Sequence, residues 1–336
     1  RIMNLRNAIK LVAPQATKSV RINAEGGSAL LVGVRGKDFV SASCAAAGSG
    51  DVLVGSLLLR SIGNTLSPDA ALTVAGNTVK IGDGVDYTLE GAASTEFPEA
   101  PEVEGPTLAL SRQLVQAVVK HVSYGAAIDE SRRVLTCVRL DKSAFVTADG
   151  FRISVLSHNL AVETPVNIPV GLFRLLPQLG PEVLLTTDDE NLHFAGEDGA
   201  ITCRAIPDKF PDYAKLIPTY NKAVTIDRKT LLSIVWKLTP VAAECNGILR
   251  LVHQKGIFTI TTQAPEVGTA SGSLETAGDT DWKIAFNAQY LSDLLSHWTC
   301  EQINVSIGTP ADPGLFAAVG AENKLISVIM PMFVLW

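Results

Sequence analysis

Residues 107–122 read TLALSRQLVQAVVKHV and join a short alternating strand directly to an amphipathic helix. The joint is Ser111, whose hydroxyl can accept a hydrogen bond from a free amide of the first helical turn. Beyond it, apolar side chains recur at helical spacing on one face, and polar side chains occupy the other. The apolar face consists of Leu114, Val115, Val118, Val119 and Val122, and the polar face of Arg112, Gln116 and Lys120. The stretch predicts one strand followed by one helix that packs on a core.

The same strand-to-helix joint occurs six times along the 336-residue chain. The joints are Asn4 (after Ile2-Met3), Ser56, Ser111, Pro169, Asp227 and Asn287, and consecutive joints are 52 to 60 residues apart. Ser, Asp and Asn cap helices, and Pro is tolerated at the first helical position. The alternative is an ordinary α+β protein whose helices recur by chance. Regular spacing with the same cap chemistry favours a repeat instead.

The segments between the helices predict short strands and tight turns. One example is Ser143–Val146, then Ala148-Asp149-Gly150 as a hairpin-type turn, then Phe151–Leu156. The repeating unit is one helix on several antiparallel strands. We therefore expect an α+β fold of three similar domains, each with two helices packed on antiparallel sheets. The domains span residues 1–105, which is short, 106–220 and 221–336, and the acidic, Pro-rich run Phe97–Pro106 lies at the first boundary.

The composition indicates a globular protein of a reducing compartment. Hydrophobic residues make up 47% of the chain and charged residues 18%, which excludes a disordered protein. No run approaches the roughly 18 consecutive apolar residues of a membrane span. Five cysteines are scattered without a C-x-x-C pair, which argues for reduced thiols rather than disulfides or zinc. We expect a cytoplasmic protein without membrane association.

Basic residues concentrate in the six predicted helices. The net charge of −6 argues against a general nucleic-acid coat, because phosphate binding needs clustered Lys and Arg. The helices reverse this balance, with only Asp227 and Asp293 opposing nine cations. These are Arg6, Lys10, Arg60, Arg112, Lys120, Arg174, Arg228, Lys229 and Lys237. A solvated face explains any one helix, but six together favour a surface that meets phosphates without reading bases.

The sequence lacks the motifs of the enzyme classes that we considered. Neither G-x-S-x-G nor H-E-x-x-H occurs, and the five histidines are isolated from one another. Gly36-Lys37 lacks the first Gly and the Ser or Thr of a phosphate-binding loop. An unrelated α+β enzyme would need a substrate pocket that the sequence does not reveal. We therefore expect a non-enzymatic protein without metal or cofactor.

Four passages give the chain a resemblance to a known family over about residues 105 to 332. They are Thr147-Ala148-Asp149-Gly150-Phe151-Arg152-Ile153, Phe210-Pro211-Asp212-Tyr213 with Leu216 and Pro218, Phe286-Asn287-Ala288-Gln289-Tyr290, and Val328-Ile329-Met330-Pro331-Met332. In this order and spacing they resemble the β subunit of bacterial DNA polymerase III, the β sliding clamp. Residues 1–105 match mainly by their repeat pattern.

The resemblance implies a processivity factor for DNA replication. In this family two chains join head to tail into a ring of three similar domains each, with helices lining the hole. The expected partners are double-stranded DNA, bound without sequence preference, a second copy of the chain, and the replicative polymerase, clamp loader and repair proteins. The protein partners would bind through short peptide motifs.

The resemblance also implies a hydrophobic peptide-binding cleft between the second and third domains. Its wall would include Leu135, Ala148, Gly150, Phe151, Arg152, Ile153, Pro211, Lys215, Leu216, Asn287, Tyr290, Val328, Ile329, Met330, Pro331 and Met332. The family usually has Thr and His at the positions of Ala148 and Phe151, and Arg at that of Lys215. We therefore expect a more apolar cleft. Without the resemblance, Phe151, Ile153 and residues 330–332 would be assigned to an ordinary core.

The family also has an Arg-aromatic DNA contact in the loop that holds Arg132 and Arg133 here. Two adjacent arginines fit phosphate binding, and a plain solvated loop is the alternative. The predicted DNA contacts are Arg6, Lys10, Arg60, Arg112, Lys120, Arg132, Arg133, Arg174, Lys229 and Lys237.

Two further hypotheses concern the ends of the resemblance. The apolar segment Phe333-Val334-Leu335-Trp336 follows the Met-Pro-Met run, and water disfavours its exposure. We hypothesise that it folds over or into the cleft and competes with partner peptides. The short first domain and the altered cleft also motivate a second interpretation of the whole chain, a clamp-like peptide-binding adaptor or decoy that does not encircle DNA.

Overall fold

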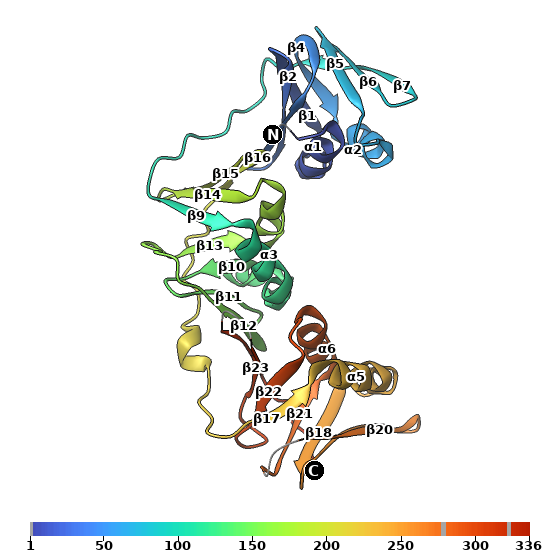
Figure 1. Ribbon diagram of the computed structural model, residues 1–336, viewed down its shortest axis with the longest axis vertical. Helices are drawn as coiled ribbons and strands as arrows, with labels where there is room; N and C mark the ends of the chain where they lie inside the picture. The colour runs from blue at the N-terminus through green and yellow to red at the C-terminus, as the bar shows by residue number, and fades with distance from the viewer. Residues whose placement is uncertain (1–2, 277–279, 321–323) are drawn as a thin grey trace. The chain divides into compact units, whose positions relative to one another are not determined.

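The computed structural model describes residues 3–276, 280–320 and 324–336. It confirms the α+β class, with 24% helix and 43% strand. Ile2, which belongs to the first predicted joint, lies outside the described residues. The chain forms two compact units, one of Arg1–Gln116 with Gly171–Pro207 and one of Ala117–Val170 with Asp208–Trp336 (Figure 1).

Each of the six predicted joints leads into an α-helix within the described ranges. The helices are α1 (Leu5–Val12), α2 (Ser56–Thr65), α3 (Arg112–His121), α4 (Val170–Phe173), α5 (Arg228–Ala243) and α6 (Ala288–His297). Short 3-10 helices are η1 (Ala13–Gln15), η2 (Ser123–Gly125), η3 (Glu130–Thr136), η4 (Leu176–Gln178) and η5 (Tyr213–Leu216). The repeat inferred from the sequence therefore corresponds to real helices.

Four predicted capping side chains accept hydrogen bonds from the first helical turn. Asn4 accepts from the Asn7 amide, Ser111 from Leu114, Asp227 from Thr230 and Asn287 from Gln289, at 2.9, 3.3, 2.7 and 2.8 Å. The prediction for Ser56 was wrong. This residue is already helical, and Gly55 is the N-cap of α2 without a side-chain bond.

The first unit contains one mixed sheet in the described residues. Its strands follow the order β7-β6-β5-β4-β1-β2-β3-β16-β15-β14-β9, and β8 pairs with β4. They are β1 (Ser19–Glu25), β2 (Ser28–Arg35), β3 (Asp38–Ala45), β4 (Ala47–Gly55), β5 (Ala71–Ala75), β6 (Thr78–Gly82), β7 (Asp86–Glu90), β8 (Ala92–Ala93), β9 (Thr107–Ser111), β14 (Glu182–Thr187), β15 (Asn191–Gly196) and β16 (Gly199–Arg204). All pairs are antiparallel except β4 with β5, which is parallel and departs from the predicted antiparallel sheets.

The second unit contains two antiparallel sheets in the described residues. The larger has the order β13-β10-β11-β12-β24-β23-β22-β17, and the smaller β20-β19-β18-β21. The strands are β10 (Cys137–Leu140), β11 (Ala144–Ala148), β12 (Arg152–Ser157), β13 (Val166–Pro169), β17 (Val224–Asp227), β18 (Ile248–Gln254), β19 (Ile257–Ala264), β20 (Gly268–Glu275), β21 (Trp282–Asn287), β22 (Gln302–Ser306), β23 (Gly314–Ala318) and β24 (Leu325–Ile329).

Helix α5 shows how the helices are held on these sheets. It packs against β19, β20 and α6, and its apolar face is buried. Leu231 and Val235 are 1% and 0% exposed. Burying such a side chain contributes roughly 1.5–3 kcal/mol each. The opposite face, with Lys229 and Lys237, stays in solvent.

Continuous backbone pairing crosses both predicted domain boundaries. Strand β3 pairs with β16 through Val40 and Ile201, which joins segments of predicted domains 1 and 2. Strand β12 pairs with β24 through Ile153 and Val328, which joins segments of predicted domains 2 and 3. Compactness thus groups the chain into two units, while the three-domain division stays a prediction from the repeat.

Candidate functional site

An apolar cleft lies within the second unit, above a buried hydrophobic cluster. Three neighbouring strands, β11, β12 and β24, supply its floor, and Leu135, Val146 and Val155 belong to the buried cluster beneath. The cavity measures about 520 Å³. It is lined by Arg132, Leu135, Ala148, Gly150, Phe151, Arg152, Ile153, Pro211, Tyr213, Lys215, Leu216, Pro218, Pro313, Val328 and Met330.

A tight turn between β11 and β12 places Phe151 at the cleft. The Asp149 carboxylate accepts hydrogen bonds from the amides of Phe151 and Arg152 at 2.9 and 3.0 Å. Gly150 has a φ of +97°, a conformation that L side chains rarely adopt. The turn predicted from Ala148-Asp149-Gly150 is therefore present. Its geometry favours Asp at position 149, which accepts both hydrogen bonds, and Gly at position 150, where φ is positive.

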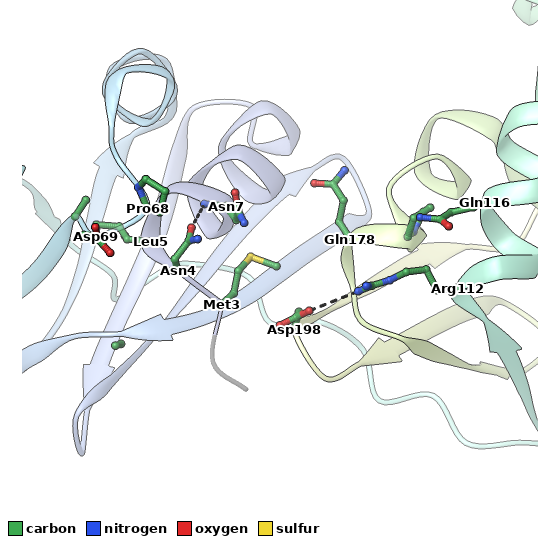
Figure 2. A pocket seen from close by; sticks show the side chains of 13 residues that line it. Met3, Asn4, Leu5, Asn7, Pro68, Asp69, Arg112, Gln116, Gln178 and Asp198 are labelled. Atoms are coloured by element: carbon green, nitrogen blue, oxygen red, sulfur yellow. Dashed lines mark hydrogen bonds and ion pairs between the residues drawn. The ribbon is translucent and has the colours of Figure 1, made fainter.

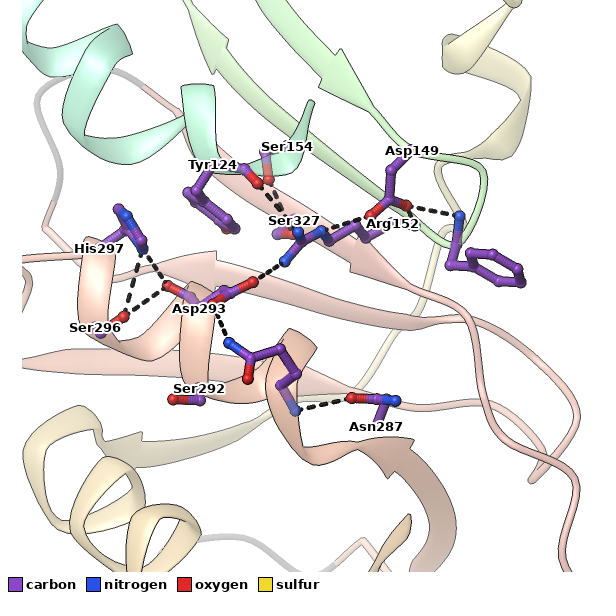
Figure 3. Close-up of polar contacts among 12 residues, drawn as sticks. Tyr124, Asp149, Arg152, Ser154, Asn287, Ser292, Asp293, Ser296, His297 and Ser327 are labelled. Atoms are coloured by element: carbon purple, nitrogen blue, oxygen red, sulfur yellow. Dashed lines mark hydrogen bonds and ion pairs between the residues drawn. The ribbon is translucent and has the colours of Figure 1, made fainter. Parts of the chain in front are cut away.

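Arg152 ties the cleft wall to helix α6 (Figure 3). Its guanidinium donates to Asp149 at 2.9 Å, to Asp293 at 2.6 Å and to the Tyr124 carbonyl at 3.1 Å. The same group lies 5.4 Å from the Tyr124 ring centre and 4.7 Å from that of Tyr290. With each of its three nitrogens donating one hydrogen bond and its side chain 10% exposed, Arg152 holds the cleft wall in position.

Tyr290 supports the cleft from behind. Its ring stacks on Phe151 with centroids 6.3 Å apart. Burial raises the pKa of the Tyr290 phenol, and Asp149 adds to this effect, so the group remains neutral at physiological pH. Arg152 and Tyr290 together form a rigid base for the exposed ring of Phe151.

Several large apolar side chains of the cleft are open to solvent. Phe151 is 57% exposed, Leu216 54% and Met330 45%. Phe151 and Met330 are therefore not core residues, whereas Ile153, at 7%, is buried. Lys215 forms an ion pair with Asp212 at 2.7 Å on the rim. The arrangement suits short segments with apolar side chains, because adaptable Met and aromatic surfaces accept varied partners.

Most of the predicted cleft residues meet in this cavity, and some do not. Ile329 is fully buried, because successive strand residues point to opposite faces and its neighbours Val328 and Met330 face the cleft. Asn287 caps α6. Tyr290, Pro331 and Met332 do not line the cavity either.

Four lining residues were absent from the predicted set. Tyr213 and Pro218 belong to a passage that carried the resemblance, so the signal was present in the sequence. Pro313 precedes β23 and carries no such signal. Arg132 was predicted to contact DNA, but it lines the cleft and donates to the Asp149 carbonyl at 3.5 Å.

The apolar segment 333–336 does not enter the cleft, contrary to the hypothesis from the sequence. The amide of Met332 donates to the Ala285 carbonyl on β21 at 2.7 Å, which leads the chain along that strand. The Lys283 ammonium then lies 5.0 Å from the centre of the Trp336 ring. The Met332 hydrogen bond and this cation–π contact place the segment beside β21, while Phe333 remains 93% exposed.

Most of the predicted DNA-contacting cations reach solvent. The exposed ones are Lys10, Arg60, Lys120, Arg132, Arg133, Arg174, Lys229 and Lys237. Arg174 was predicted to lie on a helix but follows the single turn of α4. Arg228, counted with the helix cations, is buried and donates to the carbonyls of Cys300 and Leu295 at 2.7 and 2.6 Å.

Arg112 and Arg6 are less available than predicted. Arg112 donates to the Gly180 carbonyl at 2.8 Å and lies 3.9 Å from Asp198 (Figure 2). It borders a polar groove of about 690 Å³ to which Asn4 and Gln178 also contribute. Arg6 on α1 is half-buried. Both cations still contribute positive charge to the electrostatic potential around their helices, but their side chains are less free to reach a phosphate.

Among the described residues, no group of three or more His, Cys, Asp or Glu side chains could hold a metal ion. No helix in that part of the chain is long and apolar enough to cross a membrane.

Comparisons with known proteins agree with this architecture. The family "DNA polymerase III beta subunit, C-terminal domain" matches residues 214–333. The beta sliding clamp of Synechococcus elongatus is 26% identical over 309 residues, covering 84% of this chain and 82% of the relative.

Solved structures show the same fold over nearly the whole chain. The DNA polymerase III beta subunit of Thermotoga maritima superimposes with a TM-score of 0.89 at 20% identity, covering 99% of this chain and 98% of that one. The Pseudomonas aeruginosa sliding clamp bound to griselimycin gives 0.88 at 21% identity, covering 98% and 97%. The fold is that of a sliding clamp. The resemblance inferred from the sequence is thereby confirmed, because residues 214–333 match the C-terminal domain of that family and nearly the whole chain shares its fold.

Proposed function

We propose that the chain is a DNA sliding clamp, a non-enzymatic processivity factor that closes as a homodimeric ring around duplex DNA. The observation that carries this proposal is the exposed basic side chains on helices of a chain whose net charge is −6. Phosphate contacts by Lys and Arg carry no sequence information. A ring needs only such weak contacts, because its topology prevents escape while the DNA slides.

The second part of the proposal assigns the apolar cleft to short peptide motifs of the replicative polymerase, clamp loader and repair proteins. A cavity of about 520 Å³ falls within the usual range for ligand pockets. Its exposed Phe151, Leu216 and Met330 supply apolar anchors, and the Arg152 network holds the wall before a ligand arrives. Such preorganisation lowers the ordering cost of binding.

Retention on circular DNA tests the ring. The protein and a matched loader are incubated with nicked circular DNA and passed over a sizing column in moderate salt. We expect co-elution that disappears when the DNA is linearised. Co-elution that survives linearisation, or no co-elution although the loader is active and the chain dimerises, would overturn encirclement.

Calorimetric titration with griselimycin, which was crystallised with the Pseudomonas aeruginosa clamp, tests the cleft. We expect binding to the unmodified chain and at least tenfold weaker binding to Phe151→Ala, because that side chain is an exposed wall of the cavity. Ile257→Ala is a matched control, since Ile257 is 51% exposed on β19 and does not line the cleft. Equal affinity of both variants would contradict the assignment.

A clamp-like peptide-binding adaptor that does not encircle DNA is the second candidate. The observation that favours it is the placement of three predicted DNA contacts: Arg132 lines the cleft, Arg112 is engaged by Gly180 and Asp198, and Arg6 is half-buried. The two tests separate the candidates. Griselimycin binding without retention on circular DNA would identify the adaptor.

A further inference from the structure

Trp236 on α5 is a large aromatic side chain held in place at the surface. It is 54% exposed. Its indole N–H donates to the Ser292 hydroxyl on α6 at 2.9 Å, and α5 and α6 lie side by side (Figure 1). The hydrogen bond satisfies the polar atom of the indole and restricts the ring, so that an apolar face is offered to solvent in a fixed position. A fixed and exposed aromatic face of this kind can stack on a planar group of a binding partner.

The charges around this ring are complementary to phosphate. Lys229 lies seven residues, about two turns, before Trp236 and therefore on the same side of α5, and Lys237 is its neighbour in sequence; both are exposed. The span Arg228–Ala243 contains no acidic residue. Just outside it, Asp227 accepts from the Thr230 amide and hydroxyl, while Glu244 is exposed at the far end.

Helix α6 adds polar but uncharged groups beside the indole. Its one carboxylate, Asp293, accepts hydrogen bonds from the Arg152 guanidinium at 2.6 Å and from the side-chain amide of Gln289 at 2.7 Å. Ser292 is the hydroxyl group on this helix that contacts the indole. The surface of the α5–α6 pair therefore combines an immobilised aromatic face with flanking ammonium groups. The negative charge of Asp293 on α6 is compensated by Arg152.

We propose that Trp236, flanked by Lys229 and Lys237, is a contact site for single-stranded DNA, with the indole stacked on an unpaired base. Stacking needs a base whose face is free, which a single strand offers and an intact duplex does not. The two ammonium groups would meet the phosphates on either side. This contact goes beyond the proposed encirclement of duplex DNA, because it requires neither a ring nor a loader.

Intrinsic fluorescence reports on this site directly. Trp282 and Trp298 are 8% and 1% exposed, whereas Trp336 is 47% exposed. In a Trp336→Phe background, Trp236 is therefore the main accessible indole of the described chain. We expect a 20-nucleotide oligo(dT) at low salt to quench this emission, and a blunt duplex of the same length to quench it far less. Replacing Trp236 by Phe in that background should abolish the quenching.

Affinities measured by anisotropy of labelled oligo(dT) supply the quantitative test. Trp236→Ala should weaken binding about 5-fold to 150-fold, the range expected for losing one base–aromatic stack. Lys237→Gln should reduce the slope of log K against log salt by about 0.7, the value for one lost phosphate contact on a single strand. Trp336→Ala is the matched control, because that exposed indole lies on β21 over Lys283, and it should leave the affinity unchanged.

Three outcomes would overturn the proposal: equal quenching by duplex and single strand, unchanged affinity of Trp236→Ala, or an emission change that follows protein concentration alone. The last would mean that the indole contacts a second copy of the chain. Trp236→Ala should still be retained on nicked circular duplex DNA. Failure of the stacking contact is therefore distinguishable from failure of the ring.

Discussion

Replacing Asp293 by Ala should loosen helix α6 and the turn that carries Phe151. The Asp293 carboxylate bonds the Arg152 guanidinium at 2.6 Å, with side-chain exposures of 22% and 10%. A hydrogen bond to a charged group is worth about 1.5–3 kcal/mol, and breaking a fully buried ion pair costs about 3–5 kcal/mol. Because Arg152 keeps Asp149 at 2.9 Å and the pair is partly solvated, we expect a loss of about 2 kcal/mol.

Native-state hydrogen exchange followed by mass spectrometry measures this loss where it occurs. A change of about 2 kcal/mol in local opening corresponds to about thirtyfold faster exchange, which we expect for peptides covering residues 288–297 and 149–157. Ser296→Ala is the control, because it removes an exposed hydroxyl that donates to the Asp293 backbone carbonyl at 3.1 Å and leaves the ion pair with Arg152 intact. Exchange that matches the control in both segments would refute the claim that Arg152 ties the cleft wall to α6.

Three further predictions follow from local chemistry. Gly150→Ala should cost about 1–3 kcal/mol, because its φ of +97° strains any L side chain; calorimetric unfolding should show a lower Tm, and an unchanged Tm would contradict the strain. Burial raises the pKa of Cys44 and Cys137 to about 12, so Ellman's reagent at pH 7.5 should label them only after unfolding, and rapid labelling of the native chain would be the contrary result. Burial lowers the pKa of His158 below its usual 6.5, and its neutral Nδ1 accepts from the Leu160 amide. Its contribution to stability is therefore present above pH 6.5 and lost as the pH falls through that value toward the folded-state pKa. Tm measured from pH 7.5 to 5 should fall less steeply for His158→Asn, and parallel curves would rule out this contribution.

The sequence predicted the helices well, because their signals are local. Asp227 and Asn287 each stand where a strand ends and a helical period begins, and both cap the helix that follows. The prediction that Ser56 caps α2 was wrong because Gly can also be an N-cap, and the pair Gly55-Ser56 does not show which of the two residues has that role. The fourth helix is one turn long, which fits Gly171 within it and Pro177 four residues after its last residue.

The cleft was predicted less completely, because its geometry is not local. Strand alternation separates Ile329 from its neighbours, and the predicted run of five residues ignored that alternation. Pro313 reaches the cavity from the loop that precedes β23, and no short motif indicates this position. Arg132 is attached to the turn at Asp149, a contact across 17 residues. The path of residues 333–336 follows from the hydrogen bond between the Met332 amide and the Ala285 carbonyl on β21. No sequence motif indicates that contact.

The continuous pairing of β3 with β16 and of β12 with β24 has a consequence for how this chain tolerates sequence drift. Backbone hydrogen bonds join amides and carbonyls that every residue except Pro supplies. The two junctions therefore place few demands on side-chain identity, beyond keeping apolar residues on the buried face. A chain built in this way can exchange most of its residues and still hold its sheets in register. This accounts for a fold shared with the Thermotoga maritima protein at a TM-score of 0.89, although only 20% of the aligned residues are identical.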